Sequence, residues 1–346
     1  MNKNITPISD YAHTTLLGMN GGCPESPDGK HIVYSRKETL ETNAQELWLC
    51  DTDLANHRKI CNAQMYNHNG LSATFVDINR VVFRSSHEGK SRIYVVNIHS
   101  GEVEYTVDGK EGHRAEQNKF PYNTPEAVYW LDCGTGEIVK IFDTAHMVEE
   151  IIKAGYTPNE HTVNMSHMQL NPAANKVMMR IGVSDINCKG GALLGGYDMQ
   201  TSQFSFIPNK PVHQLWYDND SYMAITLLQD GTPWERASRI DRYAITGEIL
   251  ENLGGVGNHI DGSPCRQLFT GESLYRGGEI ELFLYKKGVQ EPLAVLDSHN
   301  FQIAARELKV HMNPSFSVCG KRIYYNRPVS DGRSVAAVVD ISKYVK

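Results

Sequence analysis

The sequence predicts an all-β protein, a seven-bladed β-propeller, and three observations lead to this fold. Short runs rich in β-branched and aromatic residues alternate with turn-forming clusters along nearly the whole chain, which is the pattern of strands and hairpins. The same order of strand, turn, strand, loop and hairpin recurs at intervals of roughly 45 to 53 residues, and four-stranded units of that length are typical of propeller blades. Seven such units fill the 346 residues, so we expect a single domain over residues 1–346.

The first two blades show the expected strands most clearly. Runs of strand-forming residues occupy 31–36 and 46–51 in the first blade, and 80–85, 92–98 and 103–107 in the second. Helical periodicity is nearly absent, and residues 145–154 are the one good helix candidate. The segment before Asn20 is expected to add the outer strand to the last blade, around 339–344, which would close the ring.

Composition and charge exclude several classes of function. The net charge is −6 and the pI is about 6.2, whereas nucleic-acid-binding proteins usually carry a basic excess. No apolar run approaches the roughly 18 residues that a membrane span requires, and the first residues lack the apolar core of a secretory signal. We therefore expect a cytoplasmic protein with no nucleic-acid or membrane partner. The seven cysteines include no CxxC pair and are expected to be reduced thiols.

Propeller topology predicts where functional side chains gather. The first strand of every blade lines the channel and begins at one face, and every second strand ends at that face. The blades are predicted to begin near Asn20, Phe120 and five histidines, which are His68, His167, His213, His259 and His311. The ends of the second strands add Arg36, Arg84, His87, Arg180 and Arg327.

A channel mouth lined in this way suits an anionic, ring-shaped ligand. Arginine binds carboxylates through two parallel hydrogen bonds, and histidine exchanges protons near neutral pH. A single histidine beside a strand is usually structural, but five at one repeated position favour a function. Aromatic residues close to the mouth could stack on sugar rings, although with 17 tyrosines in the chain most are expected in the core.

Three segments resemble the oligogalacturonate lyases: HMQLNPAANKVMM at 167–179, HQLWYDNDSY at 213–222 and HMNPSFSVCGKRIYYN at 311–326. That family consists of cytoplasmic seven-bladed enzymes that cleave uronate oligomers by β-elimination, so the resemblance implies an acidic oligosaccharide substrate. It places His167 at the catalytic base, and His213 and His311 at two of three metal-binding histidines. Asn313 and Leu308 stand where the family has its third histidine and a glutamine ligand. The cofactor is therefore left open between none and a divalent cation such as Mn²⁺ or Ca²⁺.

The chain also resembles the ulvan-type and rhamnose–glucuronate lyases, which are seven-bladed too. His68 and His87 have the spacing of that family's acid–base histidine pair. Arg180, at the end of KVMMR, matches the arginine that neutralises the uronate, while Asn164 stands where that family has a tyrosine. We assign substrate contacts at the same mouth to His213, Tyr217, Tyr122 and Arg327.

The chemistry of uronate elimination explains why these residue types are expected. The proton on C5 is very weakly acidic, so the carboxylate must be neutralised by an arginine or a divalent cation, while a base removes the proton and an acid protonates the leaving oxygen. We therefore predict a lyase for a uronate-containing polysaccharide or oligosaccharide. Two alternatives remain: a non-catalytic binding propeller, and a glycosidase acting on a related acidic sugar, although no motif for paired carboxylates is evident.

Overall fold

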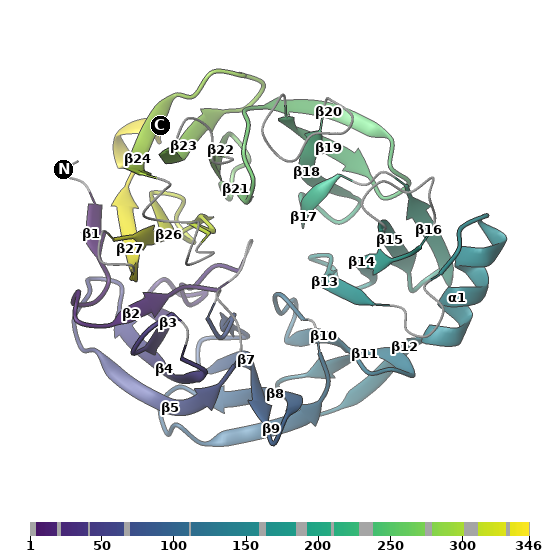
Figure 1. The fold of residues 1–346 in the computed structure, drawn as a ribbon, viewed down its shortest axis with the longest axis horizontal. Coiled ribbons are helices and arrows are strands. Elements are labelled where there is room, and N and C mark those ends of the chain that lie inside the picture. The colour runs from purple at the N-terminus through teal and green to yellow at the C-terminus, as the bar shows by residue number, and fades with distance from the viewer. Residues whose placement is uncertain are drawn as a thin grey trace.

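The computed structural model shows seven β-sheets arranged in a ring, which confirms the predicted seven-bladed propeller (Figure 1). Six sheets have four strands and one has three. The structure describes residues 5–18, 22–40, 42–65, 70–110, 112–158, 164–184, 192–208, 211–227, 238–273, 279–300, 311–329 and 333–345. Within this part of the chain, no helix has the length and apolar character needed to cross a bilayer.

The blades follow one another in chain order. The first contains β2 (Thr14–Leu16), β3 (His31–Lys37), β4 (Ala44–Asp51) and β5 (Arg58–Gln64). The second contains β6 (Thr74–Phe75), β7 (Arg80–His87), β8 (Lys90–Asn97) and β9 (Val103–Asp108). The third contains β10 (Lys119–Asn123), β11 (Ala127–Asp132) and β12 (Ile138–Asp143), followed by the helix α1 (Thr144–Lys153).

The remaining four blades complete the ring. The fourth contains β13 (Met165–Leu170), β14 (Lys176–Gly182), β15 (Ala192–Asp198) and β16 (Gln203–Ile207). The fifth contains β17 (Val212–Trp216), β18 (Ser221–Leu227), β19 (Ser238–Ala244) and β20 (Ile249–Gly254). The sixth contains β21 (Ile260–Gly262), β22 (Leu268–Glu272), β23 (Glu279–Lys286) and β24 (Ala294–Asn300). The seventh contains β25 (Ser315–Phe316), β26 (Arg322–Pro328) and β27 (Ser334–Asp340), before a 3₁₀ turn at Ser342–Tyr344.

The two ends of the described chain meet in the seventh blade. The strand β1 (Ile5–Pro7) pairs antiparallel with β27, and Ile5 lies opposite Val339. This confirms the predicted ring closure. Pairing with β1 covers the outer edge of β27, which would otherwise expose unpaired main-chain groups.

The core lies between the blades, because each sheet packs on both faces. One buried cluster joins Val33 and Leu47 of the first blade to Val81 and Phe83 of the second. This two-sided burial explains why a strand such as β27 consists almost entirely of buried residues instead of alternating apolar and polar ones. The helix α1, which matches the predicted helical segment, adds Met147 and its neighbouring apolar residues to the cluster of the third and fourth blades.

The third blade begins earlier than the sequence pattern predicted. Phe120 is buried in β10, which pairs with β11. β11 ends in the Asp132–Glu137 hairpin, as the third strand of the other blades ends in a hairpin. β10 is therefore the second strand of its blade. The start of the blade is at His113, whose N–H donates to the carbonyl of Met168 in β13 at 3.2 Å. The prediction for this blade was wrong because its first strand is too short to show a pattern.

Candidate functional site at the channel mouth

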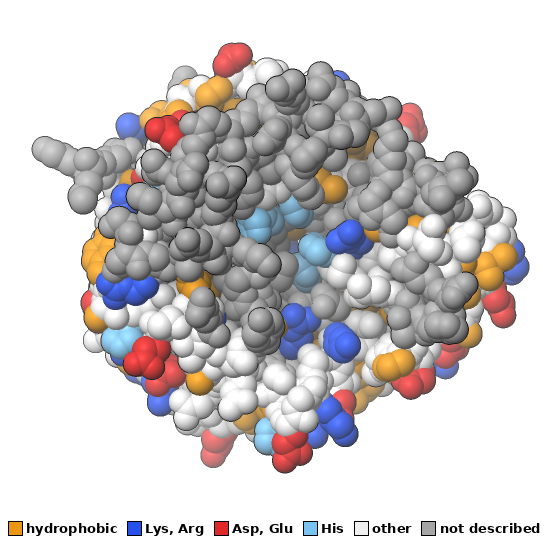
Figure 2. Space-filling view, in the orientation of Figure 1, with side chains coloured by type: hydrophobic (Ala, Val, Ile, Leu, Met, Phe, Trp, Pro, Cys, Tyr) orange, Lys and Arg blue, Asp and Glu red, His pale blue; other side chains and the backbone are white. Residues whose placement is uncertain are grey.

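Five histidines from consecutive blades form a row at the channel mouth. Neighbouring ring centroids are 5.0 Å apart for His113 and His167, 6.4 Å for His167 and His213, 4.2 Å for His213 and His259, and 4.6 Å for His259 and His311. Figure 2 shows histidine, lysine and arginine side chains gathered around the hollow at the centre of this face. The structure therefore brings together four of the histidines predicted at blade starts, and adds His113.

Backbone bulges aim two of these rings. His167 and His213 both have a φ of 54°, in the left-handed region that non-glycine residues seldom adopt. Each lies at a register shift of its first strand, between Ser166 and Gln169 in β13 and between Val212 and Leu215 in β17. Bulges re-aim side chains, and strained backbone of this kind is concentrated at functional sites. The same device in two neighbouring blades therefore orients both rings within the row.

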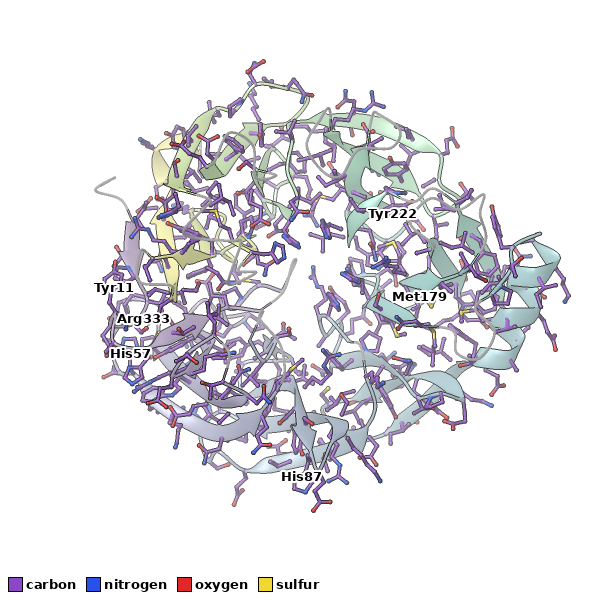
Figure 3. The ribbon with its side chains drawn as sticks, in the orientation of Figure 1. Tyr11, His57, His87, Met179, Tyr222 and Arg333 are labelled. Carbon is purple, nitrogen blue, oxygen red and sulfur yellow. The ribbon has the colours of Figure 1, made fainter. Side chains whose placement is uncertain are left out.

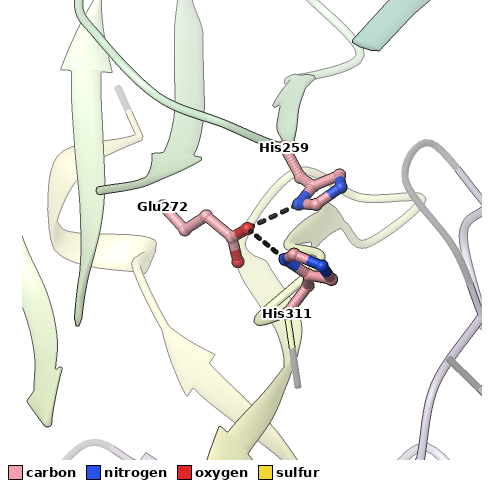
Figure 4. A group of neighbouring side chains, drawn as sticks. All are labelled: His259, Glu272 and His311. Carbon is pink, nitrogen blue, oxygen red and sulfur yellow. Dashed lines mark hydrogen bonds and ion pairs between the residues drawn. The ribbon is translucent and has the colours of Figure 1, made fainter. Parts of the chain in front are cut away.

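Glu272, the last residue of β22, is fully buried beside the row. Its Oε1 lies 2.5 Å from Nδ1 of His259 and 3.5 Å from Nδ1 of His311 (Figure 4). The amide of Asn258 donates to the same oxygen at 3.1 Å, and two main-chain N–H groups of the seventh blade donate to Oε2. Burial alone would raise the pKa of Glu272, but the two histidines and these hydrogen bonds hold it well below its usual value. Glu272 is therefore a carboxylate at neutral pH.

Hydrogen bonds assign the tautomer of three rings. Nδ1 of His213 lies 2.7 Å from the carbonyl oxygen of Asn258, and Nδ1 of His259 and of His311 face Glu272. Burial, and then neighbouring histidines, lower the pKa of His213, and burial also lowers that of His259 against the opposing effect of Glu272. In a neutral ring, a hydrogen bond from Nδ1 to an oxygen leaves the lone pair on Nε2, where it can accept a proton. A metal ion held together with Glu272 would instead replace the Nδ1 proton of His259 and His311.

Among the described residues, one group of side chains could hold a metal ion. His259, Glu272 and His311 each offer one ligand atom, and these atoms lie within 4.8 Å of one another. Imidazole nitrogen together with carboxylate oxygen suits Mn²⁺, Fe²⁺ or Zn²⁺, so the residues fit a divalent cation. Of the two histidines predicted as metal ligands, His311 belongs to this group, and the ring of His213 lies next to that of His259, tilted by 33°.

Glu272 was missed by the sequence reasoning, although a signal for it exists. It occupies the end of a second strand, the position at which four other blades carry Arg36, Arg84, Arg180 and Arg327. An acidic residue at a position that is basic in four blades marks a blade in which the local charge is reversed.

Arg180 lies on β14, the strand next to the one that carries His167. It pairs with Ser166 across β13 and β14, next to His167. Its side chain is half-buried and forms no hydrogen bond or ion pair in the part of the chain that the structure describes. A guanidinium can bind an anionic ligand through two parallel hydrogen bonds.

His113 is the residue of the row that the sequence pattern did not reveal. Its ring is buried, and its Nδ1 has no hydrogen-bond partner among the described residues. Burial, with a smaller effect of Arg84, lowers the pKa of His113 to about 4, so the ring is neutral at neutral pH. His113 precedes the turn at 115–119. To predict its position, the sequence reasoning would have had to identify this turn as the boundary between the first and second strands of the blade.

The histidine pair predicted in the second blade is not seen at the mouth. His68 lies outside the described residues. His87 is exposed at the hairpin between β7 and β8, 3.9 Å from Glu88, and Figure 3 shows it at the periphery of the disc, away from the channel. The structure does not bring His87 to the histidine row.

The other predicted substrate contacts are engaged with protein. Tyr122 is buried and stacks on Tyr129, with ring centroids 5.4 Å apart. Tyr217 follows the end of β17 that is remote from His213. The Cζ atom of Arg242 lies 4.6 Å from the centroid of the Tyr217 ring. The guanidinium of Arg327 donates to Asp297 at 3.0 Å. None of these three side chains joins the row in the described structure.

Comparison with known proteins shows the fold. No protein-family model matches the chain, and a search of curated proteins finds no match. An oligogalacturonate lyase from Vibrio parahaemolyticus superposes with a TM-score of 0.72 at 11% identity, covering 99% of this chain and 94% of that chain. An oligogalacturonate lyase in complex with manganese gives 0.66 at 12% identity, covering 97% and 92%. A chain of a mitotic checkpoint complex gives 0.55 at 9% identity, covering 98% and 91%. At these identities the likeness extends to the propeller fold and not to a function.

Proposed function

We propose that the protein is a lyase that cleaves a uronate-containing oligosaccharide by β-elimination at the channel mouth. The observation that carries this proposal is the buried Glu272, which together with the carbonyl of Asn258 fixes Nδ1 of three histidines. The second ring nitrogen of His259 and of His311 faces away from Glu272 (Figure 4). Three neighbouring imidazoles are thus held in fixed orientations at one place, and Arg180 lies on the strand next to the one that carries His167.

Neutralising the uronate carboxylate is the first requirement of this reaction. Arg180 binds one carboxylate through its planar guanidinium. A divalent cation held by His259, Glu272 and His311 would act as a Lewis acid toward the same carboxylate. The solved lyase with manganese supports Mn²⁺ as the first ion to test. Arg180 stabilises the negative charge that develops when the proton on C5 is removed, and a bound cation would add to this effect.

Proton transfer is the second requirement, and His167 is our candidate for it. The residue lies next to the strand pair that carries Arg180, and Ser166 Oγ lies 3.1 Å from its Nδ1. His167 removes the proton from C5, and the electron pair forms the C4–C5 double bond as the C4–oxygen bond breaks. The imidazolium then returns that proton to the departing oxygen. A positioned base and acid each contribute about 10²–10⁴-fold to the rate.

The test is a screen of uronate oligomers, because β-elimination alone creates a 4,5-unsaturated uronate that absorbs in the ultraviolet. We expect the absorbance to rise with an oligogalacturonate or another uronate oligomer, and to rise faster with added Mn²⁺ than with a chelator. Equal release of reducing ends without absorbance would show a glycosidase instead. Tight binding without any turnover across the panel would favour the non-catalytic binding propeller.

A further inference from the structure

His113 forms the third-blade end of the histidine row, and its side chain is buried, with an exposed fraction of 7%. Gly112 fixes its position. A Cβ atom on Gly112 would lie 2.2 Å from the ring of Phe120, so only glycine lets the chain pass at this distance. A bridge from Gly112 to Met168, and the hydrogen bond from the N–H of His113 to the carbonyl of Met168, join the start of the third blade to β13. The main chain thus holds the ring of His113 beside that of His167, with ring centroids 5.0 Å apart.

The burial of Nδ1 assigns the tautomer of His113. This nitrogen is inaccessible to solvent and has no hydrogen-bond partner among the described residues. A proton on Nδ1 would be a buried N–H without an acceptor, which folded proteins tolerate less often than an unmatched acceptor. The proton therefore belongs on Nε2. Burial, and to a smaller extent Arg84, lowers the pKa of the ring to about 4, so at neutral pH His113 is a neutral donor of one N–H.

This tautomer is the opposite of the one at His213. Nδ1 of His213 lies 2.7 Å from the carbonyl oxygen of Asn258, and in a neutral ring that contact leaves the lone pair on Nε2. The row therefore contains a ring that can accept a proton and, at its third-blade end, a ring that can donate a hydrogen bond. An elimination requires both kinds of group, because a base removes a proton while negative charge develops on the departing oxygen.

Arg180 and His113 lie on opposite sides of His167. Side chains alternate along β14, and Met178 packs in one cluster with Tyr222 of the fifth blade. Arg180, two residues later on β14, lies on the same face of the sheet, whereas His113 comes from the third blade. In a uronate, C5 lies between the carboxyl carbon and C4. With the carboxylate at Arg180 and the C5 proton at His167, the oxygen on C4 is directed toward His113.

We propose that His113 is a further catalytic residue, whose Nε2–H donates a hydrogen bond to the departing oxygen on C4. This role rests on the lyase function proposed above. When the C4–oxygen bond breaks, its electron pair moves onto the oxygen, and the hydrogen bond stabilises the negative charge there. His113 keeps its own proton, and the oxygen receives the proton that His167 removed from C5. A neutral imidazole suits this task, since it can polarise an oxygen without being an acid that ionises.

The tautomer is measured first, and without substrate. In protein labelled with ¹⁵N in its histidine rings, two-bond ¹H–¹⁵N NMR spectra at pH 7 distinguish the protonated ring nitrogen from the unprotonated one. The signals that are missing in His113→Gln identify the residue. We expect the proton on Nε2 of His113. A proton on Nδ1, or on both nitrogens, overturns the proposal.

Turnover of a uronate oligomer, followed by ultraviolet absorbance, tests the role itself. His113→Phe keeps a planar ring but removes the donor, so kcat should fall by about 10²–10³-fold while KM changes little. His113→Gln places an amide N–H near the position of Nε2 and should lose no more than about 10-fold. His99→Phe, at an exposed histidine after β8, is the matched control and should be as active as the unaltered protein. The melting temperature of His113→Phe should not fall, because the buried Nδ1 has no hydrogen bond to lose among the described residues.

A substrate with a better leaving group separates this role from a structural one. A uronate with 4-nitrophenoxide on C4 releases an oxygen that needs little stabilisation, so His113→Phe should lose less than about threefold on it. Equal losses on the two substrates, or full activity of His113→Phe on the oligomer, overturn the role of His113 and leave the lyase function standing. If the unaltered protein catalyses no elimination, both proposals are overturned together.

Discussion

Nδ1 of His259 lies 2.5 Å from the carboxylate of Glu272, and both side chains are buried where the sixth blade meets the seventh. The hydrogen bond orients the ring and sets its tautomer, while the same carboxylate also faces His311 at 3.5 Å. Carboxylates that hold metal-binding histidines in this way commonly matter as much as the ligands themselves, since their loss costs about 10- to 100-fold in metal affinity or activity.

Glu272→Gln should weaken Mn²⁺ binding by at least about 10-fold. The amide is close in shape to the carboxylate but lacks the charge that attracts the cation. Equilibrium dialysis with Mn²⁺, followed by metal analysis, measures the effect. Glu279→Gln, at an exposed glutamate of the same blade, serves as the control and should leave the affinity unchanged. Equal affinity in both variants would remove Glu272 from the metal site.

Arg180→Ala should reduce turnover of a uronate oligomer by about 10²-fold or more, since removing one group that stabilises developing negative charge typically has this effect. The melting temperature should change little, because the guanidinium has no hydrogen bond or ion pair to lose among the described residues. The rise of ultraviolet absorbance reports turnover. Arg92→Ala, which breaks an ion pair with Asp108 on the second blade, is the control for loss of a positive charge elsewhere. Full activity in Arg180→Ala would exclude this residue from the site.

The free energy of unfolding should fall as the pH drops from about 6.5 to about 4. The pKa of His113 is about 4 in the folded protein and near 6.5 in the unfolded chain. Over this interval the unfolded chain takes up a proton that the buried ring does not, so stability is full above the unfolded pKa and declines below it. The contribution of this one ring is about 3 kcal/mol.

Urea unfolding at pH 7 and at pH 4.5 measures that decline. His113→Gln removes the titrating group and should show a smaller difference between the two pH values. His99→Gln changes an exposed histidine in the turn after β8 and should behave like the unaltered protein. If His113→Gln loses as much stability on acidification as the unaltered protein does, the ring is not buried as the structure shows.

Deleting residues 1–7 should destabilise the protein and promote its aggregation. The deletion removes β1 and leaves β27 as an uncovered edge strand, which is a template for pairing with other chains. Thermal unfolding and light scattering measure the two effects. Thr6→Val retains the strand and its pairing with Val338, so it should remain monodisperse and similarly stable. If the truncated protein has the melting temperature and light scattering of the unaltered protein, the pairing of β1 with β27 contributes nothing to stability or solubility.

The fold could be predicted because the same pattern of strands and turns recurs in the sequence of several blades. Strands buried on both faces, such as β27, form continuous apolar runs, and the turns between them recur at a regular interval. The third blade was misplaced because its first strand forms only isolated bridges, such as that of Glu116 with Lys119. A strand of that length has no periodicity to detect.

The grouping of the histidines could be predicted from propeller topology, whereas their contacts with Glu272 could not. His167, His213 and His311 could be grouped because first strands begin at one face. Glu272 could not be linked to His311, since the contact joins two blades and depends on how a β22 side chain packs against the next sheet. His87 was wrongly placed at the mouth. The direction of a strand predicts on which face of the propeller its end lies, but it does not predict how far a residue lies from the central channel.

The seventh blade combines the first strand of the described chain with its last three, and it also contributes His311 to the metal-binding group. During synthesis, β1 is made before β27 and has no pairing partner until β27 follows. The group of His259, Glu272 and His311 therefore cannot assemble on a nascent chain that stops short of this blade. Metal binding by this group would thus require the seventh blade, whichever other blades had already formed.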